Sequence, residues 1–369
     1  MFDPYRRRVA KLQELMVEKD VDLFIIVTPE NYLYFSGDVR RQPRMLIPAS
    51  GDPALIVFAS EVDEVRSSSW VPRILPYRAL HEMMLNIIGE VSRLGKERPR
   101  IGLEVGFHVP SFLVERFRIS NPTAEVVQER TLIEMVRKTK DAEEIQAIRK
   151  ASELADKGME LVAAMLRPGL REKDLALELD YQLRKMGADG LGFPPFVNSG
   201  YRSLWLHGLA TDKSIEKGEL VLVDFAPVYQ GYYANISRTF VVGRPLDEHR
   251  RAMGTYVQIH RNALESLRPG IPLFEVEQRV EDHRKSLPYG EYLIRGLIHG
   301  IGLAFEEFPF PTIFPEDVMA TLDEGMTLAV GHPVLSVPGL GGFKQEDTVL
   351  LTSEGPEVLT HFRSGLIEV

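Results

Sequence analysis

The segment that most constrains the fold is residues 221–241, VLVDFAPVYQGYYANISRTFV. Two apolar, β-prone runs flank Gln230-Gly231, a pattern typical of a β-hairpin with a tight turn. Asp224 and Asn235 lie near symmetric about that turn, so we expect them almost directly opposite on paired strands, facing one side. If residue 235 were Asp, the pair would form half of a two-metal carboxylate site. Residue 235 is Asn, so one carboxylate of such a site is absent, and this restricts the mechanisms that the pair can support.

The first third of the chain alternates between predicted strands and helices. Residues 5–19 have the apolar periodicity of an amphipathic helix. Four short apolar runs are predicted strands: Leu23–Val27, Met45–Ile47, Ala54–Phe58 and Leu103–Val105. This alternation predicts a compact α/β domain over residues 1–130.

The remainder, residues 131–369, has a different pattern. Long helices are predicted from near residue 135, at 172–186, at 247–267 and at 274–286. Strands are predicted at 219–229, 232–242, 326–336 and 346–352. Helices beside antiparallel hairpins predict an α+β domain of the kind found in enzymes.

Composition excludes several classes of site. The 369 residues contain no cysteine, which excludes disulfides, zinc-thiolate sites and thiol nucleophiles. The net charge of −9 argues against nucleic acid as the main partner. No apolar run approaches the roughly 18 residues of a membrane span. The first residues, MFDPYRRRVAKLQELM, lack an apolar signal core, so we expect a cytoplasmic protein with no membrane partner.

Several motifs together resemble the creatinase/aminopeptidase P/prolidase family. They are Asn31–Gly37 (NYLYFSG), Phe193–Phe196 (FPPF), His207-Gly208, His299–Leu303 (HGIGL) and Glu346–Thr348 (EDT). The resemblance covers nearly the whole chain and is strongest to Xaa-Pro dipeptidases. It implies an α+β pita-bread catalytic domain over 131–369 and a smaller creatinase-like α/β domain over 1–130.

The resemblance also implies a set of metal ligands. In the family's metallopeptidases two Asp, one His and two Glu hold two divalent ions. Asp224, His299 and Glu346 match three of these five positions, and Asn235 stands at the second Asp. The first Glu position falls on Gly331, but His332 directly precedes Pro333 as the family's ligand precedes a proline, and a bulge would bring it into the site.

Charge limits how many ions such a site holds. Two divalent ions bring +4, whereas Asp224 and Glu346 supply only −2. Asn235 is neutral and cannot bridge two ions as a carboxylate does. One ion held by Asp224, His299, Glu346 and His332, or no ion, is therefore expected. Imidazole and carboxylate ligands suit manganese, cobalt, zinc or iron.

Three further residues are candidates for contact with the substrate. His207 occupies the position of the acid–base histidine of the metal-free creatinase branch, and His207, His299 and Glu346 form the predicted catalytic set. Glu306 and Glu307 form an acidic pair that would favour a cationic amine or amidinium. Simpler interpretations stand beside these: a solvated acidic pair, a core histidine at 332, and a structural hydrogen bond at Asn235.

Three functions follow from these residues. The first is hydrolysis of a C–N bond in a small peptide, in the manner of an Xaa-Pro dipeptidase, with one ion or none. The second is metal-free hydrolysis of a small guanidino or amidine compound. The third is a non-catalytic binding module on the same fold, since one fold hosts many functions. The resemblance also implies a homodimer.

Overall fold

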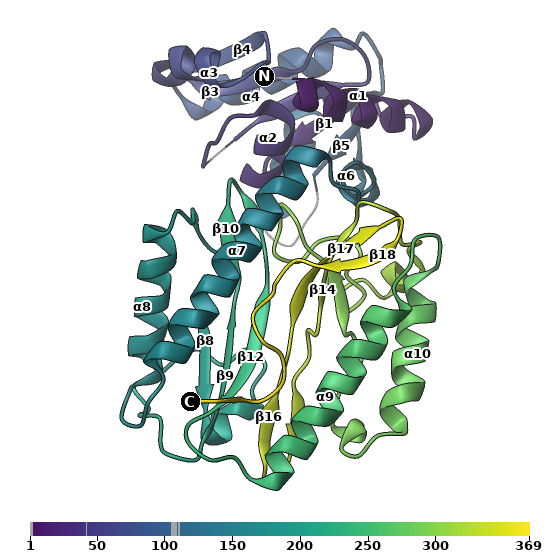
Figure 1. Cartoon of the computed structure of the whole chain (residues 1–369). Helices are drawn as coiled ribbons and strands as arrows, with labels where there is room; N and C mark the ends of the chain where they lie inside the picture. The colour runs from purple at the N-terminus through teal and green to yellow at the C-terminus, as the bar shows by residue number, and fades with distance from the viewer. Residues whose placement is uncertain (1–2, 42, 105–108, 110) are drawn as a thin grey trace. The chain divides into compact units, whose positions relative to one another are not determined.

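The computed structural model describes residues 3–41, 43–104, 109 and 111–369. The chain divides into two compact units, Met1–Arg137 and Lys138–Val369 (Figure 1). The division falls a few residues after the boundary expected at residue 130. Each unit has its own sheets and its own buried apolar core.

The N-terminal unit is built on a six-stranded mixed sheet of order β4-β3-β2-β1-β5-β6. Its strands are β1 (Leu23–Ile26), β2 (Met45–Pro48), β3 (Ala54–Phe58), β4 (Arg73–Tyr77), β5 (Arg100–Leu103) and β6 (Glu125–Gln128). Its helices are α1 (Asp3–Glu18), α2 (Pro29–Ser36), α3 (Val62–Ser68), α4 (Leu80–Arg93), α5 (Ser111–Ser120) and α6 (Arg130–Arg137). The predicted α/β character is confirmed. The strand expected at 103–105 begins earlier, as β5, and Val105 lies outside the described residues.

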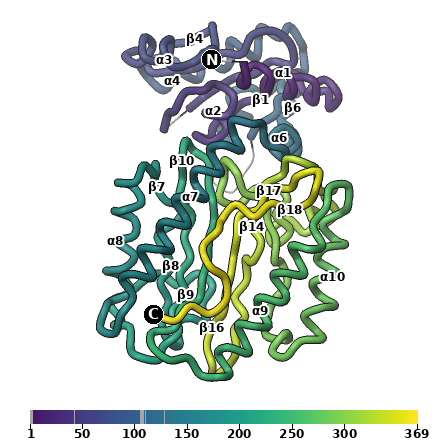
Figure 2. Tube along the Cα trace, in the orientation of Figure 1, coloured from purple at the N-terminus to yellow at the C-terminus, as the bar shows by residue number. Residues whose placement is uncertain are grey.

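The C-terminal unit has two halves, each a sheet covered by two helices (Figures 1 and 2). In the first half, α7 (Ala142–Met165) and α8 (Glu172–Lys185) share an apolar core with the sheet of order β19-β12-β9-β8. In the second half, α9 (Asp247–Ser266) and α10 (Leu273–Lys285) share one with the sheet of order β13-β14-β17-β18. The strands of the first sheet are β8 (Phe196–Ser199), β9 (Leu220–Phe225), β12 (Ile236–Val241) and β19 (Ile367–Glu368). Those of the second are β13 (Ile298–Gly300), β14 (Thr327–Val330), β17 (Asp347–Thr352) and β18 (Gly355–Val358). This arrangement confirms the predicted α+β class.

The hairpin at 221–241 forms, but with a different register from the expected one. It consists of β9 (Leu220–Phe225), β10 (Pro227–Tyr229), β11 (Tyr232–Tyr233) and β12 (Ile236–Val241). Gln230 and Gly231 have φ of 50° and 81°, the left-handed pair that a two-residue type I′ turn requires. Asp224 pairs with Ser237, so the expected direct pairing with Asn235 is wrong. Asn235 is displaced by two residues, which keeps its side chain on the same face.

Two predicted elements are interrupted. The helix expected from residue 135 is two helices, α6 and α7, because Asp141 caps a new start: its carboxylate accepts the backbone N–H groups of Glu143 and Glu144. The strand expected over 326–336 is β14 and then β15 (Leu335–Val337), which pairs with β16 (Gly341–Phe343). The break falls at Gly331, where φ is +120°.

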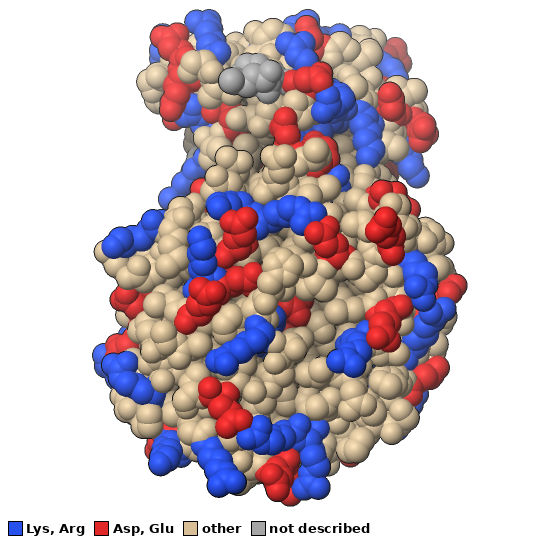
Figure 3. All heavy atoms as spheres, in the orientation of Figure 1, with Lys and Arg blue, Asp and Glu red and all other residues tan. Residues whose placement is uncertain are grey.

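The surface carries both signs of charge. On the face drawn in Figure 3, Lys and Arg are interspersed with Asp and Glu over both units. That mixture fits an acidic chain with net charge −9 and shows no extended basic stripe on this face. Across the described residues, no helix combines the length and apolarity that crossing a membrane requires.

Candidate functional site

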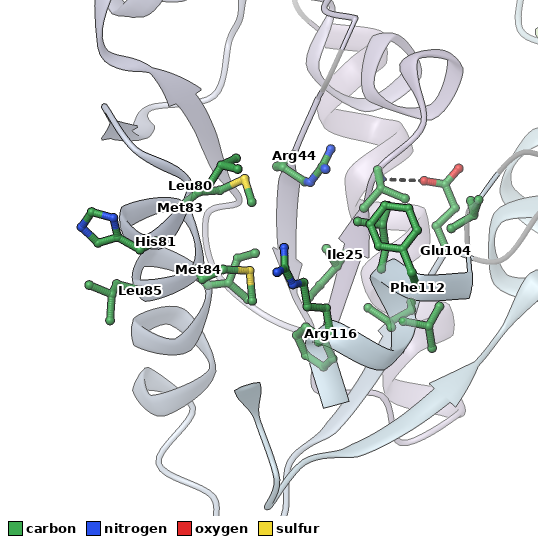
Figure 4. A pocket seen from close by; sticks show the side chains of 17 residues that line it. Ile25, Arg44, Leu80, His81, Met83, Met84, Leu85, Glu104, Phe112 and Arg116 are labelled. Carbon is green, nitrogen blue, oxygen red and sulfur yellow. Dashed lines mark hydrogen bonds between the residues drawn. The ribbon is translucent and has the colours of Figure 1, made fainter. Parts of the chain in front are cut away.

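A large cavity lies in the N-terminal unit, but none of its described lining residues has a buried side-chain polar atom without a hydrogen-bond partner. It has a volume of about 760 Å³ and lies between α4 and α5, with mainly apolar walls that include Met83, Met84 and Phe112 (Figure 4). Its one carboxylate, Glu104, already accepts hydrogen bonds from the Val27 N–H and the Asn31 amide, at 2.7 and 2.5 Å. The candidate site is instead in the C-terminal unit, where buried polar groups without partners gather.

Three adjacent strand positions form the floor of that site. Asp224 on β9 lies opposite Ser237 on β12. Ser237 in turn pairs with Glu346 through two backbone hydrogen bonds of 3.2 and 3.1 Å. Side chains at paired positions share a face. Asp224 and Glu346, both almost completely buried, are therefore brought to one floor although they are far apart in the sequence.

A buried lysine lies between these two carboxylates. Lys344 Nζ is 2.5 Å from Asp224 Oδ2 and 2.8 Å from Glu346 Oε2. Burial alone lowers the pKa of Lys344, but the charges of Asp224 and Glu346 outweigh it and raise the pKa above its ordinary value. Lys344 is thus a fixed ammonium. The sequence analysis missed it, although a residue two before Glu346 in extended chain points to the same face.

Several other buried polar atoms at this site have no partner among the described residues. Asp224 Oδ1, Glu346 Oε1 and both side-chain polar atoms of Asn235 have no hydrogen-bond partner within the described chain. The bonds expected of a structural Asn235 are made by its backbone, with Thr348 Oγ1 at 2.8 and 3.0 Å. A buried polar group without a partner costs about 1–3 kcal/mol. Several such atoms at one place indicate a site for a ligand.

Two histidines and one glutamate form a second group beside this floor. His299 on β13 donates Nδ1–H to the Gly300 carbonyl at 2.8 Å, which leaves Nε2 free, 3.7 Å from Glu346 Oε1. The rings of His299 and His332 lie 5.1 Å apart, and His332 Nδ1 is 3.9 Å from Glu306 Oε1. One donor atom each from His299, Glu306 and His332 lie within 4.8 Å of one another.

This donor set fits a divalent cation. Two imidazoles with one carboxylate suit manganese, iron or zinc. A ring N–H donated to a carbonyl, as at His299, is the arrangement that orients a metal-binding histidine. Glu306 belongs to this group, whereas the sequence analysis predicted that it contacts the substrate.

The protonation states support the same interpretation. Burial, with the nearby charges of His299 and Lys344, lowers the pKa of His332 to about 3, so its ring is neutral near pH 7. Burial alone would raise the pKa of Glu346, but the Lys344 ammonium and the nearby His299 imidazole hold it well below its usual range. The charge of Glu346 outweighs burial at His299 and raises the pKa of that imidazole. A bound cation would displace the His299 proton.

Glu306 and Glu307, the acidic pair predicted to contact the substrate, have different surroundings in the structure. Glu306 lies with the two histidines. Glu307 forms an ion pair with Lys140 at 2.6 Å and accepts the Ala304 N–H at 3.2 Å. Its carboxylate is therefore engaged in the protein, and only Glu306 is placed at the candidate site.

His207 lies on an exposed turn beside the site, next to an aromatic wall. Its ring centroid is 6.4 Å from that of His332 and 6.1 Å from that of Phe196. Phe193 contacts Phe196 and Phe305, with ring centroids 4.7 and 4.8 Å away, and Phe305 packs against His299. The site therefore has a polar floor with an apolar, aromatic side.

A tyrosine beneath the site holds the backbone around His332. The Tyr256 hydroxyl lies 2.7 Å from the Gly331 carbonyl and 2.8 Å from the Pro333 carbonyl. We expect Tyr256→Phe to weaken Mn²⁺ binding about 10-fold to 100-fold, the usual cost of losing a group that orients a ligand. Calorimetric titration measures this. Tyr181→Phe, on the exposed surface of α8, is the matched control, and equal affinities would exclude a positioning role.

Gly331 allows the chain to bring His332 inward. A Cβ at this position would lie 2.0 Å from the Gln345 carbonyl oxygen, and φ is +120°. We expect Gly331→Ala to reduce the free energy of unfolding by about 1–3 kcal/mol from backbone strain alone, and by more from the clash. Urea denaturation measures the change. Gly270→Ala, with φ +88° but open space around the Cβ, isolates the strain and is expected to cost less.

Both units match known protein families. Residues 146–353 match the model of metallopeptidase family M24, and residues 8–139 match the creatinase/prolidase N-terminal domain. An Xaa-Pro dipeptidase of Pyrococcus furiosus is 31% identical over 98% of this chain and 100% of its own length. The crystal structure of a prolidase from Pyrococcus horikoshii has a TM-score of 0.86 at 28% identity, covering 97% of this chain and 99% of that one. An Xaa-Pro dipeptidase from Bacillus anthracis has a TM-score of 0.89 at 26% identity, covering 99% and 100%.

Proposed function

The chain belongs to metallopeptidase family M24, and from that membership we propose that it hydrolyses the peptide bond before proline in small peptides. One observation carries the proposal: two buried histidines with free ring nitrogens, His299 and His332, converge with Glu306. The buried carboxylates of Asp224 and Glu346 lie beside them. The Xaa-Pro dipeptidases to which the chain is similar make the proline bond the first to test.

His299 Nε2, His332 Nδ1 and the Glu306 carboxylate would hold a divalent ion. When bound, such an ion polarises the carbonyl of the bond to be cleaved and promotes ionisation of water. Manganese, cobalt, zinc and iron are the candidates. The neutral state of His332 keeps its ring nitrogen available as a ligand at neutral pH.

The remaining side chains would bind the peptide and move protons. Phe193, Phe196 and Phe305 offer an apolar surface for the proline ring. His207, exposed beside them, would protonate the departing nitrogen, because an imidazole is the side chain best suited to proton transfer near neutral pH. The Asn235 amide has hydrogen-bonding atoms free for the peptide backbone.

A panel of dipeptides tests this function. Protein stripped of metal and reloaded separately with Mn²⁺, Co²⁺, Zn²⁺ or Fe²⁺ is given Leu-Pro, Ala-Pro and the control Leu-Ala. We expect hydrolysis of the proline peptides with at least one metal and little of Leu-Ala. Absence of turnover on every peptide with every metal would refute the proposal.

Lys344 favours one second candidate, the metal-free hydrolysis of a small amidine. Its ammonium already neutralises much of the charge of Asp224 and Glu346, as a metal would. Glu306 could then face a cationic substrate. Incubation with creatine and related guanidino compounds in the presence of a chelator tests this candidate. It fails if hydrolysis of those compounds stops on chelation and returns with metal.

Two expectations from the sequence remain predictions: a homodimer and a cytoplasmic location. Light scattering on the purified chain measures the first, and fractionation of the source cells measures the second. A monomeric mass of 41.8 kDa in solution would contradict the dimer.

A further inference from the structure

The Lys344 ammonium occupies the place where the floor carboxylates converge. Its Nζ binds one oxygen of Asp224 and one of Glu346, at 2.5 and 2.8 Å, and the side chain is almost completely buried. In the two-ion sites of the related metallopeptidases, residues matching Asp224 and Glu346 are ligands. Here those two carboxylates already share a cation that belongs to the chain.

The charges on the described residues also balance one divalent ion. With all three carboxylates ionised, as metal binding would require, Asp224, Glu346 and Glu306 contribute −3 and Lys344 contributes +1, which leaves −2. One divalent cation neutralises that charge, whereas two would leave +2 in a buried site. Burying an uncompensated charge is costly. Asn235, the residue at the second Asp position, adds no charge.

We infer that this chain binds a single divalent cation, at His299, Glu306 and His332, and that the Lys344 ammonium takes the place of a second ion. The inference rests on the proposed function in one respect, namely that the site binds a divalent ion. It concerns the number of bound ions and not the substrate. Lys344 is then a structural cation, which compensates the charge of Asp224 and Glu346 and closes their shared position to metal.

Counting bound Mn²⁺ tests the inference. Calorimetric titration with elemental analysis gives the stoichiometry, and electron paramagnetic resonance distinguishes an isolated Mn²⁺ from an exchange-coupled pair. We expect one isolated ion per wild-type chain and one in Asn235→Asp, because Lys344 remains. The double variant Asn235→Asp/Lys344→Met should bind two ions with a coupled spectrum. Lys140→Met removes another buried, ion-paired lysine and is expected to stay at one.

Several results would overturn the inference, and some do not depend on the folding of the double variant. Two ions per wild-type chain, or no ion, would each contradict it. Two ions in Asn235→Asp alone would show that the Asn, rather than the lysine, limits the number. The peptide assay separates the two proposals: turnover with two ions refutes only this inference, whereas one ion without turnover refutes only the proposed function.

Discussion

Alanine at His299 is expected to lower kcat/KM for an Xaa-Pro dipeptide by at least about 100-fold, since losing even a group that merely orients a ligand costs 10-fold to 100-fold. The buried imidazole supplies a free Nε2, which lies 3.7 Å from Glu346 Oε1. His332→Ala should act similarly, because its Nδ1 is the second free nitrogen of the trio. Steady-state kinetics and Mn²⁺ titration of the same preparations measure both losses.

The control is a histidine outside the site. His283 lies near the end of α10, and His283→Ala should retain wild-type turnover and ion binding. If His299→Ala kept its Mn²⁺ but lost activity, His299 would act on the substrate instead of the ion. Full activity in both His299→Ala and His332→Ala would remove the trio from the mechanism.

Replacing Lys344 by methionine is expected to reduce the free energy of unfolding by roughly 3–5 kcal/mol, the usual cost of breaking a buried ion pair. Methionine has a similar length but no charge, so Asp224 and Glu346 would face each other across a buried floor without their cation. Their mutual repulsion adds to the loss of the two hydrogen bonds. Urea denaturation of the metal-free protein measures the change.

Two further variants locate the cause of that loss. Asp224→Asn/Lys344→Met removes one of the two facing charges and should recover part of the stability. Lys150→Met breaks an exposed pair with Glu153 on α7 and should change the free energy of unfolding by less than about 1 kcal/mol. Equal losses in Lys344→Met and Lys150→Met would show that the Lys344 pairs contribute no more than surface ones.

Much of the fold follows from local chemistry in the sequence. Gln230-Gly231 specifies its turn, because few residues other than glycine adopt the left-handed backbone that such a turn needs. Helices α8, α9 and α10 begin and end close to the expected residues, since each has a periodic apolar face and a clear stop. The resemblance to the family's motifs likewise implies His299, Asp224 and Glu346 as site residues.

The arrangement of the candidate site depends on contacts between distant segments. Ser237, which lies opposite Asp224, pairs with Glu346 from a segment more than 100 residues away, and this pairing brings the two carboxylates together. The break at Gly331 comes from a close approach of Gln345, which no pattern around residue 331 reveals.

Local sequence proposed most of the residues of the candidate site, and tertiary packing decided how they are grouped. Glu306 and Glu307 are neighbours with identical side chains, yet one joins His299 and His332 and the other pairs with Lys140. Lys344 reaches Asp224 across 120 residues of chain. The position of a buried charge depends on which strands meet around it, and that is a property of the folded sheets rather than of any single segment.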